Sequence, residues 1–70
     1  MSNITGFGKN VKKRLIDSEK SQEWLISEVR KKTGLYFDSS YLYKILTGQL
    51  TTPKIVNAIN EILEFEKEVS

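Results

Sequence analysis

Apolar side chains recur at intervals of three and four residues along most of this sequence. The clearest runs are Val11 with Leu15, Leu25 with Val29, Leu42 with Ile45 and Leu46, and Ile55 with Ile59. Residues at this spacing share one face of an α-helix, whereas no segment alternates between apolar and polar residues as a half-buried strand does. The pattern predicts an all-α protein with four helices, or five if the chain breaks away after Leu63. Each helix is too short to be stable alone, so the helices must pack on each other.

The length of 70 residues predicts a single domain over residues 1–70, because so short a chain cannot support two apolar cores. The absence of cysteine and histidine excludes disulfides, thiol nucleophiles, imidazole bases and metal sites built on those ligands. The other polar residues show no spacing typical of a nucleophile and its base. We therefore expect no enzyme activity, no catalytic residue, no cofactor and no metal.

No apolar stretch approaches the roughly 20 residues needed to cross a bilayer. The N-terminus also lacks the apolar segment of a signal peptide. From these two features we expect a cytoplasmic protein with no membrane partner.

Residues that begin and end helices mark the first two. Thr5 is a possible cap for a helix over about residues 7–17, and Ser21 is a plausible cap for a second helix over about residues 21–33. Gly34 would end the second helix in a left-handed conformation.

The segment from Asp38 to Gly48 is predicted to be one short helix, over about residues 38–47. Asp38 or Ser39 can cap its start, and Gly48 can end it. Its inner face is apolar, with Leu42, Ile45 and Leu46. Its outer face is polar, aromatic and cationic, with Ser40, Tyr43, Lys44 and Thr47. Such an outer face could read the edges of DNA bases, or it could be an ordinary solvated surface.

The connection before this helix carries three consecutive large side chains, Leu35, Tyr36 and Phe37. So much apolar surface is unfavourable in water, and we expect at least Leu35 and Phe37 to fold back on the core. After the helix, Thr52 and Pro53 should open a last helix, with Thr52 as its cap and proline in the first turn.

The charge is unevenly distributed along the chain. Residues 1–32 carry eight Lys or Arg and four acids, residues 33–54 carry two and one, and residues 55–70 carry one and four. A polyanion would therefore meet the first half, although a solvated surface of mixed charge is the alternative. Within this half, the basic run at residues 12–14 could hold a phosphate, whereas the run at residues 30–32 has a structural explanation at a helix C-terminus.

Two joined helices, the second apolar inside and polar outside, form the helix-turn-helix pattern. The order and spacing of Ser21-Gln22-Glu23-Trp24-Leu25, Leu42-Tyr43-Lys44-Ile45, Gly48 and Pro53 resemble the phage lambda repressor and Cro-like helix-turn-helix domains, over roughly residues 7–63. The resemblance implies a compact four- to five-helix lambda-repressor-like domain. It also implies a sequence-specific regulator of transcription from a phage or mobile element, with double-stranded DNA as its partner.

The resemblance further implies which residues contact DNA. Gln22 stands where a phosphate contact is common, and Ser39, Ser40, Tyr43 and Lys44 stand where side chains reach bases or nearby phosphates, while Gln49 and Lys54 match positions that often touch the backbone. Each has a structural alternative. Gln22 could serve only to cap helix two, Tyr43 could fold onto the core, and Lys54 could simply be solvated.

Three features depart from the family pattern. The connection through residues 31–34 is longer by about four residues, which could change how deeply the third helix enters the groove. Ile26 occupies a position that is often alanine, and Leu46 one that is often acidic. These departures leave open a second hypothesis, a protein-binding module such as an antirepressor or inhibitor on the same scaffold.

Phe65 and Val69 lie one helical turn apart beyond the expected core. They could join two copies of the chain through their C-terminal helices, or they could cover the core of a monomer. A homodimer would double the number of DNA contacts.

Overall fold

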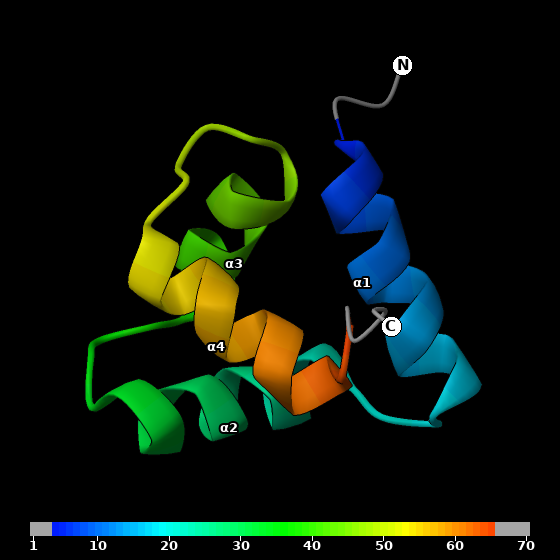
Figure 1. Cartoon of the computed structure of the whole chain (residues 1–70), viewed down its shortest axis with the longest axis horizontal. Coiled ribbons are helices and arrows are strands. Elements are labelled where there is room, and N and C mark those ends of the chain that lie inside the picture. The colour runs from blue at the N-terminus through cyan, green and yellow to red at the C-terminus, as the bar shows by residue number, and fades with distance from the viewer. Residues whose placement is uncertain (1–3, 66–70) are drawn as a thin grey trace.

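The computed structural model describes residues 4–65, which contain four helices and no strand (Figure 1). The helices are α1 (Gly6–Asp17), α2 (Gln22–Thr33), α3 (Ser39–Leu46) and α4 (Pro53–Leu63). The all-α prediction is confirmed, and the first three helices begin and end within one residue of the expected bounds. Glu64 ends α4 with a left-handed φ of 59°. The region in which a fifth helix could lie falls mostly outside the described residues.

Local capping explains where the first three helices begin. The side chains of Thr5, Ser21 and Asp38 each accept a hydrogen bond from the backbone N–H three residues later, at 2.9, 3.0 and 2.9 Å. Gly34 ends α2 with a φ of 72°, and Gly48 follows α3 with a φ of 82°. The caps predicted for these three helices and both predicted glycine ends are confirmed, because these signals act within a single turn of chain.

The start of α4 differs from the prediction in one respect. Pro53 lies in the first turn as expected, but the side chain of Thr52 makes no capping hydrogen bond. Its hydroxyl lies 2.9 Å from the hydroxyl of Tyr41 on α3. Thr52 therefore occupies the N-cap position as expected, but its hydroxyl bonds to a residue eleven positions away in place of the α4 backbone, and this bond ties the start of α4 to α3.

The helices surround one apolar core. In Figure 1, α4 crosses between α2 and α3, and α1 closes the other side of the molecule. The most extensive helix pair is α2 with α4, and α1 packs mainly against α3. The buried core consists of Val11, Leu15, Leu25, Val29, Phe37, Leu42, Ile45, Leu46, Ile55, Ile59 and Leu63. The residues that share predicted inner faces therefore meet, since burial of these stripes is what stabilises helices this short.

The linker between α2 and α3 buries only one of its three large side chains. Phe37 is fully buried and its ring centroid lies 5.1 Å from that of Tyr41. Leu35 is 39% exposed, so its predicted burial was wrong. The backbone N–H of Leu35 donates to the hydroxyl of Thr33 at 3.1 Å, which holds Leu35 at the end of α2. The chain therefore turns inward only after Leu35.

Candidate nucleic-acid interface

The inner face of α3 fixes the direction of its outer face. Leu42, Ile45 and Leu46 are each no more than 3% exposed, so rotation of α3 about its axis would move apolar surface into water. The opposite side of the helix must consequently face outward.

The far end of α3 is held by the start of α1. The carbonyl oxygen of Leu46 accepts hydrogen bonds from the backbone N–H of Thr5 at 3.1 Å and from its hydroxyl at 3.0 Å. The same hydroxyl accepts the N–H of Gly8, so one side chain both caps α1 and binds α3. Gly8 is buried here, and a Cβ atom added to it would lie 2.3 Å from the Leu46 oxygen. The two helix ends meet at this distance because residue 8 has no side chain.

Four of the predicted DNA contacts lie on the outer face of α3, which we call the α3 face: Ser39, Ser40, Tyr43 and Lys44. All four are exposed, and Tyr43 retains 58% of its surface. The alternative that Tyr43 folds onto the core is therefore wrong. The α3 face presents two serine hydroxyls, a tyrosine ring with its own hydroxyl, and an ammonium group, with no acidic residue in α3 itself.

Ser40 and Lys44 also share a shallow hollow of about 240 Å³ with residues that precede α3. Its lining is Tyr36, Asp38, Ser40, Tyr41, Lys44 and Leu50. The hollow combines aromatic and aliphatic surface with one cation. It extends the α3 face onto the linker from α2.

A hydrogen-bonded pair forms the linker side of this hollow. The hydroxyl of Tyr36 donates to Oδ2 of Asp38, while Oδ1 of Asp38 accepts the N–H of Tyr41. The bond from Tyr36 and then that from the Tyr41 N–H lower the pKa of Asp38 below its ordinary value of 3.8. The bond to Asp38, followed by the negative charge of that carboxylate, raises the pKa of Tyr36. The ring of Tyr36 is 71% exposed, so the pair presents an aromatic surface to solvent.

The lowered pKa of Asp38 predicts how stability depends on pH. A carboxylate with a lowered folded-state pKa stabilises the fold above its unfolded-state pKa, and this contribution is lost as pH falls through the folded-state value. We therefore expect Asp38→Asn to melt at a lower temperature than wild type at pH 7, and the difference to shrink below pH 3.8. Thermal melts followed by circular dichroism measure this. A difference in melting temperature that stays constant down to pH 2 would contradict this prediction. In the unfolded chain an aspartate has its ordinary pKa and is almost fully protonated about two pH units below it.

Gln49 lies at the far end of the α3 face. Its backbone N–H donates to the carbonyl of Lys44 at 2.8 Å, and its amide donates to the hydroxyl of Thr47 at 3.1 Å. Gln22 is exposed in the first turn of α2. Among residues 4–65 it makes no side-chain hydrogen bond to α3. The structure thus gathers five predicted contacts at α3 and leaves Gln22 on a different helix.

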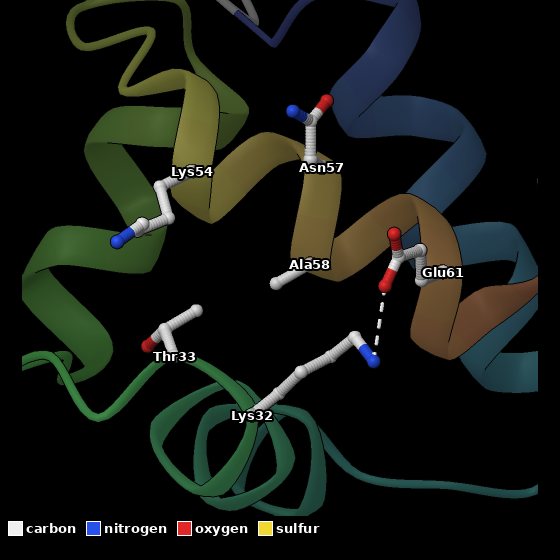
Figure 2. Close-up of a pocket in the computed structure, with 6 residues that line it drawn as sticks. All are labelled: Lys32, Thr33, Lys54, Asn57, Ala58 and Glu61. Carbon is white, nitrogen blue, oxygen red and sulfur yellow. Dashed lines mark ion pairs between the residues drawn. The ribbon is translucent and has the colours of Figure 1, made fainter.

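Lys54 also lies apart from the hollow beside α3. Lys54 lines a separate hollow of about 350 Å³ between the end of α2 and α4 (Figure 2). The other residues that line this hollow are Lys32, Thr33, Asn57, Ala58 and Glu61. Across this hollow, the ammonium of Lys32 lies 3.0 Å from Oε1 of Glu61. Lys54 has no ion pair among the described residues, and its charge faces solvent at the start of α4.

Few of the cations are neutralised within residues 4–65. The ion pairs there are Lys31 with Glu28 at 3.3 Å and Lys32 with Glu61. Arg14 donates to the carbonyl of Leu63 and lies over the ring of Phe65. The cations without an ion pair in this range include Lys9, Lys12, Lys13, Arg30, Lys44 and Lys54. Lys44 therefore brings a charge without an ion pair to the last turn of the α3 face.

Two residues at this surface were missed by sequence reasoning. Tyr36 was treated only as part of an apolar run, and Arg30 was explained by its place near a helix C-terminus. The run itself held a usable signal, because a linker this short has little room for three large side chains in the core. The proximity of Arg30 to Tyr36 had no sequence signal, since it depends on how the linker leaves α2.

The described residues contain no cluster of three or more acidic side chains able to hold a metal ion. No helix between residues 4 and 65 has the length and apolar character needed to span a bilayer. A scan against protein-family models gave no match, and searches of curated proteins and of solved structures gave none either.

Proposed function

We propose that this chain is a sequence-specific double-stranded DNA-binding regulator, with α2 and α3 as a lambda-repressor-like helix-turn-helix. The observation that carries the proposal is the α3 face. A buried inner surface directs Ser40, Tyr43 and Lys44 outward on a helix that Asp38 caps at its start and that Thr5, the N-cap residue of α1, binds at its end. A rigid helix that presents a free cation and hydroxyls meets the requirements of a reader of base edges.

The dimensions of helix and groove agree with this function. An α-helix with its side chains is about 10–12 Å across, and the major groove is about 12 Å wide. The ammonium of Lys44 would donate to guanine O6 or N7, and the hydroxyl of Ser40 can pair with several bases. Gln22, Gln49 and Lys54 would bind backbone phosphates and set the register of α3. Through its resemblance to phage repressors, the proposed role is occupation of an operator from a phage or mobile element.

Replacing Lys44 by alanine tests the reading of bases. We expect a loss of about 1–3 kcal/mol in binding free energy at the cognate site, with a smaller loss on unrelated DNA. Fluorescence anisotropy with both DNAs at one salt concentration measures the two losses. Lys54→Ala is the matched control, because a phosphate contact should weaken binding to both DNAs equally. Equal losses for Lys44→Ala on both DNAs would show that Lys44 reads no base.

The cognate site itself can be found by selection from a random pool of DNA duplexes at moderate salt. Repeated enrichment of one sequence supports the proposal, and a palindrome would add that two copies bind together. A pool without enrichment, together with binding that does not weaken with salt, would overturn it.

A homodimer through Phe65 and Val69 is a separate part of the proposal. Phe65 packs edge to face on Phe7, with ring centroids 6.3 Å apart, and the guanidinium of Arg14 lies 5.1 Å from its ring centroid. This packing is what covering the monomer core requires, and Val69 lies outside the described residues. Light scattering over micromolar concentrations measures the mass, and a monomer mass throughout would exclude a dimer in that range.

One observation favours the second candidate, a protein-binding module. Three large side chains around the α3 face are exposed: Tyr36 at 71%, Tyr43 at 58% and Leu50 at 38%. Tyrosines of this kind are enriched among the energetically important residues of protein interfaces. An apolar protein interface would lack the steep loss of affinity with salt that phosphate binding shows, so the salt dependence of binding separates the two candidates.

A further inference from the structure

We propose that Arg30, in the last turn of α2, and Tyr36, on the linker side of the hollow, contact the sugar-phosphate backbone at the wall of the groove that α3 enters. We call these two residues the linker grip. The inference rests on the proposed DNA-binding function and adds to it a second contact surface, outside α3, that holds DNA without reading its sequence.

The linker places Tyr36 beside the N-terminal end of α3. Phe37 is buried and packs on Tyr41, which anchors the linker and leaves the preceding residue at the surface. Tyr36 then lines the same hollow as Ser40 and Lys44. The N-terminal residues of a recognition helix contact base edges. A side chain just outside that end therefore lies nearest to the groove wall, where deoxyribose and phosphate alternate.

The hydroxyl of Tyr36 is already used within the protein. It donates to Oδ2 of Asp38, so it has no proton left for a base acceptor. What remains for a partner is the exposed ring, which offers apolar contact with a deoxyribose. Contact of this kind is the same for every sequence, so Tyr36 should contribute affinity without discrimination.

Arg30 supplies the charge that complements this ring. Its carbonyl accepts the N–H of Gly34 at 2.8 Å, where the linker leaves α2, and its positive charge acts to lower the pKa of Tyr36 against the larger effect of Asp38. Arg30 is exposed and has no ion pair among residues 4–65, whereas its neighbour Lys31 pairs with Glu28 at 3.3 Å. Arginine binds phosphate well because its planar fork can donate two parallel hydrogen bonds.

The one negative charge nearby does not oppose an approaching phosphate strongly. Both carboxylate oxygens of Asp38 accept hydrogen bonds, one from Tyr36 and one from the Tyr41 N–H. The positive charge of Lys44 also acts on Asp38. The charges of Lys44 and Asp38, which both line the hollow, cancel, so the charge of Arg30 at the end of α2 leaves this part of the surface net positive.

Substitutions at Tyr36 test the ring contact. Tyr36→Ala should weaken binding about five- to tenfold on cognate and unrelated DNA alike, because an apolar contact is removed. The dependence on salt should not change. Tyr36→Phe keeps the ring and should stay within about threefold of wild type. Ile16→Ala is the control, since Ile16 on α1 is also exposed, at 74%, and lies outside the hollow.

Substitution of Arg30 tests the phosphate contact. Arg30→Ala should make the slope of log affinity against log salt shallower by about one, as expected for one lost phosphate contact. Lys31→Ala removes an equal charge from the same helix and should change the slope less. Anisotropy titrations between about 50 and 200 mM salt give these slopes, and circular dichroism confirms that each variant is folded.

The outcomes distinguish the inference from the proposed function. If wild type binds DNA with a steep salt dependence while Tyr36→Ala and Arg30→Ala bind as wild type does, the linker grip is overturned and the function stands. If Tyr36→Phe loses as much as Tyr36→Ala, the ring contact is wrong because the hydroxyl carries the effect. If wild type binds no DNA, both proposals fail.

Discussion

Phe37→Ala is expected to lower the free energy of unfolding by about 3–5 kcal/mol, the usual cost of deleting a buried phenylalanine ring. Phe37 is fully buried although it lies in the linker, and its ring packs on Tyr41. Small domains have unfolding free energies of only about 5–15 kcal/mol, so a loss of this size removes between about a fifth of the stability and nearly all of it. The substitution should also abolish binding, because the same ring holds the linker and the start of α3 in place.

Urea denaturation followed by the fluorescence of the single tryptophan, Trp24, measures this loss. Leu35→Ala is the matched control in the same linker. Leu35 is 39% exposed, so its removal should cost well under half as much. Equal losses for the two variants would mean that the linker does not bury Phe37 preferentially.

Gly8→Ala is expected to destabilise the protein by about 3 kcal/mol, at the upper end of the range for overpacking. The added Cβ would lie 2.3 Å from the carbonyl oxygen of Leu46 and 2.6 Å from Cγ1 of Ile4. The oxygen belongs to the backbone of α3, so α1 and α3 must separate to relieve the clash. That separation would weaken the hydrogen bonds from Thr5 to the Leu46 carbonyl and tilt the α3 face.

Gly6→Ala provides the comparison two residues earlier in the same helix. A Cβ at this position would meet nothing within 4 Å. The replacement should leave stability unchanged or raise it by up to about 1 kcal/mol, because alanine is the better helix former. Thermal melts of both variants separate the effect of contact from that of helix propensity. If Gly8→Ala melts as Gly6→Ala does, the close approach of α1 to α3 is wrong.

Much of the fold followed from local sequence signals. Thr5, Ser21 and Asp38 marked the helix starts because a capping side chain bonds a backbone N–H only three residues away. The two faces of α3 followed from spacing in the same way, since a helix repeats every 3.6 residues. The exposure of Ser40, Tyr43 and Lys44 is the outcome of that spacing.

Other features depended on contacts between distant residues. No local rule distinguishes a threonine hydroxyl that caps its own helix from one that bonds Tyr41 on another, which is why the bond of the Thr52 hydroxyl was not predicted. Leu35 and Phe37 are both large apolar residues, but only Phe37 is buried, where its ring packs on Tyr41. The predicted contact residues likewise divide by tertiary position, with Ser40 and Lys44 in one hollow and Lys54 in another.

The sequence by itself determined that the chain is helical, where its helices begin and end, and which side of α3 carries its polar groups. Periodicity and capping suffice for this because they act within a few residues. Only the tertiary structure decided which residues hold α3 in place and which side chains of the linker lie next to it. The bonds between Thr5 and the Leu46 carbonyl join residues 41 positions apart, and the hollow shared by Tyr36 and Lys44 depends on the path of the linker. Such contacts depend on how the packed helices share one core, which no short stretch of sequence specifies.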